Sequence, residues 1–375
     1  MNLFSFFKPK SALGIDIGTS ALKIVQLARA GDTWKLENYG EISFLQGRAP
    51  MEAYQQNALK MSDGEIAELL SRIIAQSKAT AKTAAMSLPV FSSFSTIIEL
   101  PAMPKDEMEK AIQFEARQYV PIPLSEVSLD FMIIGEGRKD ITPPATSPVA
   151  VVSNVSPQAS PHKKKHVEVL LVAVPNEITQ KYRRIAEQIG LSLAAIEIET
   201  FPLARALLPD PRVVTVIVDI GARSTDICIV DNGFVRISHN FEFSGVDITK
   251  AYAEFAKVDF LDAEKKKKMT GLNLTPGQLS GAVSLTAILD DIINETDRIM
   301  ASYFNKTGRS VAAVLLAGGG ANMPGMKERF AEKLPHIQVS VGNAFEHVRY
   351  PPELAHVLAE RGPSLAVAVG LAMRR

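Results

Sequence analysis

The chain has 375 residues, of which 46% are hydrophobic and 22% are charged, a balance typical of a globular protein with room for two compact domains. Lys plus Arg and Asp plus Glu both number 41, so no overall field favours a nucleic-acid partner, and none is expected. The single cysteine, Cys228, excludes an internal disulfide and fits a reducing compartment such as the cytoplasm.

No apolar stretch approaches the roughly 20 residues of a membrane-spanning helix, because the longest, such as VEVLLVAV, has the length of a strand. The N-terminal segment MNLFSFFKPK lacks the basic region and the small-residue cleavage site of a secretion signal. Its Leu and Phe side chains, followed by lysines, fit an interfacial segment at a membrane. Packing on the domain or disorder is the better interpretation of so short a tail.

The chain opens with a predicted three-strand meander. LGIDIG is a buried strand, ALKIVQLA returns after a turn at Thr19 and Ser20, and TWKLENYGEISF follows a second turn. A helix is predicted from about Ser62, and TAAMSLP is the next strand. The apolar face of this helix contains Ile66, Leu69, Leu70, Ile73 and Ile74.

An α/β insertion is predicted next. A helix between Pro104 and Pro121 has Pro at its start and early acidic residues. A strand, HVEVLLVAVP, a helix from Asn176 to Gly190 and a strand, LAAIEI, complete the insertion. Residues 136–166, dense in Pro, Ser and Thr and ending in a lysine run, predict a flexible, solvated loop. The helix is expected to pack through a stripe of Met108, Ile112, Ala116 and Tyr119.

The second half repeats the opening of the first. VVTVIVDIG, TDICIV and FVRISHNFEF are predicted strands, and Asp231-Asn232-Gly233 is a hairpin turn. Three helices follow: SGVDITKAYAEFAKV, a short one from AEKKKKM, and the amphipathic SLTAILDDIINETDRIMASYF. VAAVLLAGGGANMPGMKERFAEKL then predicts a strand, a glycine turn and a helix, and SLAVAVGLAMRR predicts a helix of small residues.

The two Asp-Ile-Gly turns predict a phosphate site, because tight glycine turns present backbone N–H donors to phosphate. In the first turn Asp16 is the carboxylate for a hydrated Mg²⁺, and Lys23 neutralises the phosphate. In the second turn Asp219 is the opposing metal-side carboxylate. The sequence therefore predicts a two-domain clamp on a polyphosphate. The cradles are Gly18, Thr19 and Ser20 in the first turn, and Gly221, Ala222, Arg223, Ser224 and Thr225 in the second.

A third turn contains Gly318, Gly319 and Gly320 between a buried strand and a helix. Such a run lets the backbone pass close to a ribose or base, and it offers a helix N-terminus to an anion. The sequence contains neither a Walker lysine loop nor a GxGxxG motif, which argues against P-loop and dinucleotide folds.

In this order, the three turns resemble the phosphate 1, phosphate 2 and adenosine motifs of the actin-like ATPase superfamily, over nearly the whole chain. The resemblance implies an α/β fold of two related domains around a nucleotide cleft, with ATP and Mg²⁺ as cofactors. IEIETFPLARAL resembles the first connecting segment, where Glu199 either orients the attacking water or is only a helix-start carboxylate. AEKKK resembles a pattern that implies Glu264 and Lys267 near the adenosine. GPSLAVAVGLA resembles the second connecting helix, whose small residues let two helices cross closely.

Within the superfamily, the nearest resemblance is to the PilM family of type IV pilus assembly, itself similar to the division protein FtsA. ELPAMPKDEMEKAIQFEARQYVPIPLSEVSLDF resembles that family's insertion domain, and NETDRIMASYF and VGNAFEHV also match. The resemblance implies a cytoplasmic protein that binds the N-terminal cytoplasmic peptide of a PilN-like membrane protein. It would reach the inner membrane only through such partners and would couple its nucleotide state to assembly of the inner-membrane complex; self-association is left open.

Two features depart from the family pattern. The loop at 136–166 is longer than the usual connection, and Arg223 is large for a phosphate 2 turn. Arg223 argues against vigorous hydrolysis more than against binding, so at most a slow ATPase is expected.

Four subdomains are expected. The first core, 1A, comprises 1–86 and 196–210, and the insertion, 1C, comprises 87–195. The second core, 2A, comprises 211–248 and 310–375, and 2B, on the nucleotide side, comprises 249–309.

Two other functions share this fold. A metabolite kinase needs an Asp base and polar sugar-binding loops in the first domain, and the sequence offers no convincing candidate. An FtsA-like filament former ends in a linker and an amphipathic membrane helix, whereas this sequence ends at AMRR, directly after the second connecting helix. A nucleotide-binding adaptor is therefore the preferred hypothesis.

Overall fold

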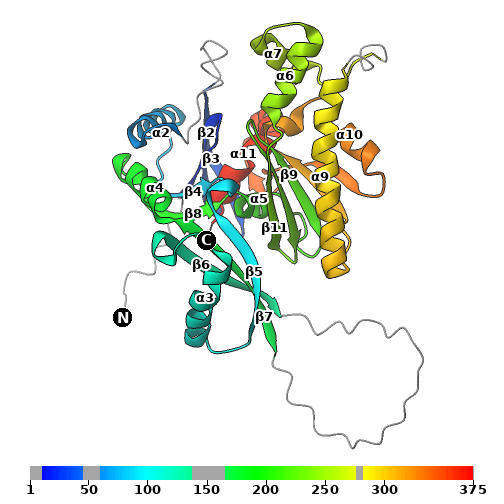
Figure 1. Ribbon diagram of the computed structural model, residues 1–375. Coiled ribbons are helices and arrows are strands. Elements are labelled where there is room, and N and C mark those ends of the chain that lie inside the picture. The colour runs from blue at the N-terminus through cyan, green and yellow to red at the C-terminus, as the bar shows by residue number, and fades with distance from the viewer. Residues whose placement is uncertain (1–10, 45–59, 137–164, 276–281, 375) are drawn as a thin grey trace, which may run out of the picture. The chain divides into compact units, whose positions relative to one another are not determined.

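The computed structural model describes residues 11–44, 60–136, 165–275 and 282–374 (Figure 1). Its contacts divide the chain into two compact units: unit 1 is Met1–Ser92 with Glu177–Arg375, and unit 2 is Ser93–Asn176. The N-terminal tail and most of the Pro-rich segment predicted at 136–166 lie outside the described residues. Where the structure describes the chain, no helix combines the length and the apolarity needed to cross a bilayer.

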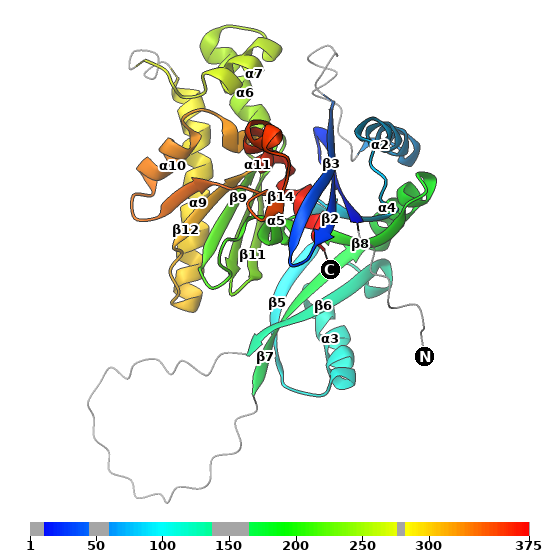
Figure 2. The same cartoon turned by 180° about the vertical axis from the view of Figure 1, so that it is seen from behind.

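The first half of unit 1 is built on a six-stranded sheet with the order β14-β3-β2-β1-β4-β8. Figure 2 labels β2, β3, β8 and β14 of this sheet. Strands β1 to β3 form the predicted antiparallel meander, whereas β4 and β8 run parallel to β1. The short strand β14, from late in the sequence, pairs with β3. The strands are β1 (Ser11–Ile17), β2 (Ala21–Ala30), β3 (Thr33–Ser43), β4 (Thr83–Leu88), β8 (Ser192–Ile198) and β14 (Val348–Arg349).

Among the described residues, helices α2 (Asp63–Ser77) and α4 (Asn176–Gln188) belong to this half. Helix α2 packs along β2 and β3 and begins with a capping box, in which Ser62 and Glu65 satisfy each other's backbone N–H groups. Arg184 of α4 lies 2.8 Å from Asp63 at the start of α2. The ion pair therefore holds α4 beside α2 (Figure 1).

The second half of unit 1 repeats this design in a five-stranded sheet with the order β11-β10-β9-β12-β13. Strands β9 to β11 form an antiparallel meander, and β12 runs parallel to β9 as β4 does to β1. Asn232 and Gly233 have positive φ angles of 52° and 78°, as a two-residue hairpin turn requires. The strands are β9 (Thr215–Ile220), β10 (Thr225–Asp231), β11 (Phe234–Phe241), β12 (Ala313–Ala317) and β13 (Gln338–Val341).

In the described part of the chain, helices α6, α7, α9 and α10 accompany this second sheet. The long helix α9 buries its apolar stripe, including Leu285, Leu289 and Ile292, against the strands, as its spacing predicts. Helix α6 starts beside the turn between β9 and β10, because Gly245 N donates to Gly221 O at 2.9 Å. The helices are α6 (Gly245–Ala256), α7 (Phe260–Met269), α9 (Val283–Thr307) and α10 (Met326–Lys333), with 3-10 turns η4 (Gly319–Asn322) and η5 (Pro352–Leu354).

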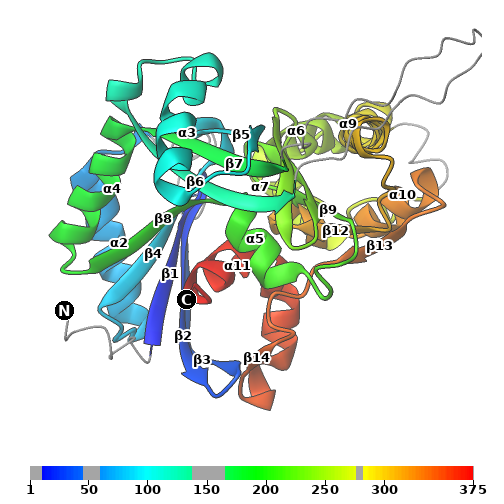
Figure 3. The same ribbon diagram turned by 90° about the horizontal axis from the view of Figure 1, so that it is seen from below.

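Helices α5 (Thr200–Leu207) and α11 (Ala355–Ala372) lie between the two sheets (Figure 3). A Cβ atom on Gly370 would overlap the carbonyl oxygen of Pro202 in α5, and a Cβ on Gly14 would overlap the carbonyl oxygen of Ala368. The backbones therefore meet at positions that only glycine permits. The close crossing expected from the small residues of the last helix is confirmed.

Replacing Gly370 with alanine should lower the free energy of unfolding by about 1–3 kcal/mol, because the added methyl has no room beside Pro202. The helix-propensity gain of at most about 1 kcal/mol does not offset this cost. Gly64 in α2 is the matched control, since no atom lies within 4 Å of the position of its Cβ; Gly64→Ala should be neutral or slightly stabilising. Urea unfolding checks both variants, and an unfolding midpoint for Gly370→Ala at or above wild type would contradict the prediction.

Unit 2 is a three-stranded antiparallel sheet, in the order β5-β7-β6, with one helix packed on it. The buried stripe of helix α3 contains Met108, Ile112 and Ala116, as predicted, but Tyr119 is 43% exposed. The prediction that Tyr119 packs in the core is wrong, because the helix ends at this residue. The elements are η2 (Val90–Ser92) just before the unit, then β5 (Phe94–Pro101), α3 (Lys105–Tyr119), η3 (Leu124–Glu126), β6 (Val127–Glu136) and β7 (His166–Pro175).

Candidate functional site

A pocket within unit 1 is formed where the three predicted turns meet. They are the β1–β2 turn, the β9–β10 turn and the glycine run after β12. The pocket also reaches α6, α7 and α11. Of the residues predicted for the site, it is lined by Asp16, Gly18, Thr19, Ser20, Lys23, Glu199, Asp219, Gly221, Ser224, Glu264, Lys267, Gly318, Gly319 and Gly320.

Two residues of the predicted second cradle, Arg223 and Thr225, do not line this pocket. The side chain of Thr225 is fully buried, and its hydroxyl donates to Phe243 O at 2.7 Å. The Thr225 side chain thus packs behind the second turn and does not face the pocket. Arg223 is the residue on which the expectation of slow hydrolysis was based.

The first turn places a carboxylate and an ammonium group together. Asp16 and Lys23 are paired across β1 and β2, and Lys23 Nζ lies 3.5 Å from Asp16 Oδ2. Burial lowers the pKa of Lys23, but Asp16, Glu41 and Asp219 outweigh it and raise that pKa above its ordinary value. Lys23 therefore stays charged and available to an anion.

Asp16 is fixed by a residue that sequence reasoning missed. Ser87, buried near the end of β4, donates to Asp16 Oδ1 at 2.8 Å and accepts from Ile17 N at 3.3 Å. The only sequence signal was a serine within the apolar strand TAAMSL. Ser87 reaches Asp16 because β4 pairs with β1, and the sequence does not show that pairing.

The second turn is closed by its own backbone. Gly221 N donates to Ser224 O at 3.0 Å, and a Cβ on Gly221 would come within 2.8 Å of that oxygen. Asp219, directly before the turn, is paired across the strands with Asp226. Burial, together with Asp226 and Asp16 and opposed by Lys23, raises the pKa of Asp219 to about 7. Asp219 is therefore poised to exchange its proton for a cation near neutral pH.

Asp226 is a second lining residue that the sequence analysis did not select. It is 5% exposed, faces the pocket, and accepts from Asn240 Nδ2 at 2.8 Å. A charged residue in the buried strand TDICIVD was the available signal. With Asp16, Asp219 and Glu199 it makes the pocket rich in carboxylates.

The third turn follows β12 and touches the second. Gly318 has φ +78°, and a Cβ there would overlap Asp219 Oδ1 and Ile220 O. Gly320 faces the side chain of Ile220 in the same way. The glycines are therefore required for the backbone after β12 to pass directly beside Asp219.

Glu199 stands at the start of α5, but no side-chain hydrogen bond caps this helix. Instead its Oε1 accepts from Val90 N at 3.0 Å. Burial, with added repulsion from Asp226, Asp219 and Asp16, raises the pKa of Glu199 well above its ordinary value. Glu199 therefore stands at the start of a helix and lines the pocket at the same time.

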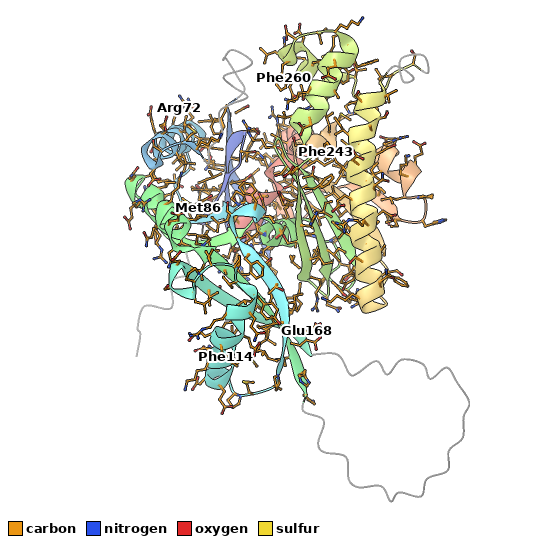
Figure 4. The ribbon with its side chains drawn as sticks, in the orientation of Figure 1. Arg72, Met86, Phe114, Glu168, Phe243 and Phe260 are labelled. Carbon is orange, nitrogen blue, oxygen red and sulfur yellow. The ribbon has the colours of Figure 1, made fainter. Side chains whose placement is uncertain are left out.

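Lys267 is buried and already fully hydrogen-bonded. Its ammonium lies 2.9 Å from Gly245 O, 2.7 Å from Thr249 Oγ1 and 2.6 Å from Glu264 Oε2. An ammonium has three donors, so these contacts satisfy it and join α7 to the start of α6. The neighbouring Lys268, which also lines the pocket and was not predicted, is the exposed cation on this side. Phe260, at the start of α7, completes this wall (Figure 4).

The donor set suits a hard, hydrated cation. Within the described ranges no group of three or more His, Cys, Asp or Glu side chains forms a protein-only metal site. Asp16 and Asp219 instead offer carboxylate oxygens beside phosphate-type turns. Mg²⁺ commonly binds in this way, keeping several waters and sharing ligands with substrate phosphates.

The duplicated meanders, the two connecting helices and the pocket between the repeated turns define an actin-like ATPase fold, as the sequence analysis predicted. Over residues 14–150 and 153–375 the chain matches the family described as type IV pilus assembly protein PilM, and it belongs to that family. The resemblance to the PilM family stated from the sequence is confirmed.

Solved structures agree. The chain is similar to a structure described as "PilM-PilN type IV pilus biogenesis complex", with a TM-score of 0.74, 25% identity, and coverage of 97% of this chain and 98% of that one. It shares its fold with ethanolamine utilization protein EutJ from Carboxydothermus hydrogenoformans, at a TM-score of 0.50, 14% identity, and coverage of 98% and 90%.

Curated relatives match less of the molecule. EutJ from Salmonella typhimurium is 26% identical over 155 residues, which are 41% of this chain and 50% of that protein. The chain thus spans about half the length of the curated relatives it matches.

Proposed function

We propose that the protein is a nucleotide-binding adaptor of type IV pilus assembly. ATP with Mg²⁺ occupies the pocket of unit 1, and a PilN-like membrane protein is recruited through its N-terminal cytoplasmic peptide. The main support for nucleotide binding is that three glycine turns lie together with Asp16, Asp219 and a charged Lys23 in one pocket. Such an arrangement favours a polyphosphate with its cation over a neutral ligand.

The predicted residues that line the pocket are proposed to act as follows. The first two turns cradle phosphate, Asp16 and Asp219 face the metal, and the Gly318–Gly320 run lies along the nucleoside. Glu199 orients the attacking water. Slow turnover, below about 1 s⁻¹, remains part of the proposal.

The partner peptide is proposed because the similar solved structure contains PilN as well as PilM. Unit 2 offers a place for it. Among the described strands β6 pairs only with β7, and its Met132 and Ile133 are each 52% exposed. An extended peptide can add to such an edge, with backbone hydrogen bonds for affinity and alternate side chains for register.

The proposed location of the protein in the cell follows from its proposed membrane partner. The protein is proposed to act in the cytoplasm and to reach the inner membrane through the PilN-like protein. The four subdomains 1A, 1C, 2A and 2B remain the proposed division of the chain, with 1C centred on unit 2. Self-association can be measured by sedimentation with and without nucleotide.

Binding of the partner's N-terminal peptide should be coupled to nucleotide. Calorimetry with and without saturating Mg·ATP should show peptide affinities that differ by about 5–150-fold, and the peptide should change nucleotide affinity by the same factor. Met132→Asp should weaken peptide binding, whereas Asp130→Asn, on the same exposed strand, is the matched control. Absence of peptide binding, or phosphate release well above about 1 s⁻¹, would favour the enzyme hypothesis instead.

A further inference from the structure

A short segment connects the floor of the pocket to unit 2. Strand β4 ends at Leu88, Pro89 and the turn η2 follow, and unit 2 begins at Ser93. Residues 88–92 are therefore the last part of unit 1 along the chain before unit 2 begins. The contacts of this segment are unusual in that one distant residue makes two of them.

That residue is Glu199. Its backbone N–H donates to Leu88 O at 3.0 Å, and its carboxylate Oε1 accepts from Val90 N at 3.0 Å. The two hydrogen bonds bracket Pro89, which has no N–H of its own to donate. Glu199 thus holds the segment on both sides of the proline.

The same carboxylate faces the ligand pocket. Glu199 lines it together with Asp219 and Asp226, and so do Pro89 and Phe91 of the connecting segment. Phe91 is 52% exposed, a high value for a Phe within a wall of carboxylates and glycine turns. The connecting segment is therefore itself part of the pocket wall.

We infer that Glu199 is a positioning residue that passes the ligand state of the pocket to residues 89–92, and so to the start of unit 2. This inference rests on the proposed nucleotide binding and names its regulation. A cation, or the water bound to it, competes with Val90 N–H for the Glu199 carboxylate. The hydrogen bond to Val90 weakens when the pocket fills, because a cation draws electron density from the carboxylate and makes it a weaker acceptor. A ligand shifts a conformation only through such a difference between states.

Amide hydrogen exchange of the full chain tests the inference, with Mg·AMPPNP as the probe and calorimetry to establish saturation. Exchange in a peptide covering residues 88–93 should rise by at least about fivefold when the wild-type protein is saturated. In Val90→Pro the donor is absent, so nucleotide affinity should stay within about threefold of wild type, while the remaining amides lose their response to nucleotide. Ser92→Ala, in the same turn but without a bond to Glu199, should respond like the wild type.

Glu199→Gln separates signalling from a purely structural role. The amide oxygen can still accept from Val90 N–H, so exchange should be slow without ligand, as in the wild type. It lacks the charge that attracts a cation, so exchange should remain slow at saturation. A Gln variant that responds like the wild type, or a wild type that binds Mg·AMPPNP with no change at 88–93, would overturn the inference and leave the proposed function standing. Failure of the wild type to bind Mg·AMPPNP would instead reject the proposed function itself.

Discussion

Asp16→Ala should lower the affinity for Mg·ATP by about 30–150-fold, equivalent to roughly 2–3 kcal/mol. Asp16 is 5% exposed and is oriented by Ser87, so its carboxylate is presented to the pocket in one geometry. Its loss removes a metal-side charge and also takes one anionic partner from Lys23. Calorimetry at fixed Mg²⁺ concentration measures the effect.

Asp16→Asn is the matched variant, because its amide oxygen can still accept from Ser87 while the charge is gone. It should bind nucleotide as poorly as Asp16→Ala but unfold closer to the wild-type temperature. If chelating Mg²⁺ lowers wild-type affinity to the level of both variants, the carboxylate acts through the cation. Unchanged affinity in Asp16→Ala would remove Asp16 from the site.

Asp219→Asn should stabilise the ligand-free protein and yet abolish most of its Mg-dependent nucleotide binding. The pKa of Asp219 is raised to about 7 in the folded protein, above that of an Asp in an unfolded chain. Between these two pKa values the folded state binds more protons than the unfolded state, so this group makes stability fall as pH rises towards 7. At pH 8 the folded protein carries the full cost of the charge, about 4 kcal/mol for a rise of about three pKa units, and Asn should relieve most of it. At pH 4, where Asp219 is protonated, the two proteins should unfold alike.

Nucleotide binding should show the opposite dependence on pH. A cation facing Asp219 must displace its proton, so wild-type affinity for Mg-nucleotide should rise by about tenfold between pH 6 and 8. Asp219→Asn should bind weakly and lack this rise. Titrations at pH 6, 7 and 8 compare the two proteins directly, and parallel profiles would show that Asp219 does not face the metal.

The sequence by itself determined the elements and the family. Several features could be predicted because they are local patterns in the sequence, which do not depend on distant residues. They are the repeated Asp-Ile-Gly turns, the meanders around them and the glycine run at 318–320. The small residues of the last helix predicted a close helix crossing for the same reason. The insertion motif gave the family, which the match over nearly the whole chain confirms.

Domain limits depended on pairing across the sheet. Unit 2, Ser93–Asn176, lies inside the proposed 87–195 insertion, because β8 pairs with β4 in the first sheet and Arg184 of α4 pairs with Asp63 of α2. The sequence of a strand does not show which sheet the strand joins. Its apolar pattern indicates which residues are buried, but it does not identify the neighbouring strand. Tyr119 was predicted to pack in the core for a related reason. The spacing of apolar residues shows which face of a helix is buried, but it does not show at which residue the burial ends.

Only the tertiary structure decided which side chains share the pocket and what each is free to do there. Ser87 reaches Asp16 because β4 lies beside β1, and Asp226 reaches the pocket because β10 lies beside β9. Lys267 was expected near the adenosine; it lines the pocket, and Gly245, Thr249 and Glu264 satisfy all of its donors. Charge and hydrogen-bonding capacity are fixed by residue type, whereas the partners that use them come from distant parts of the chain, so the roles in this site were settled by packing.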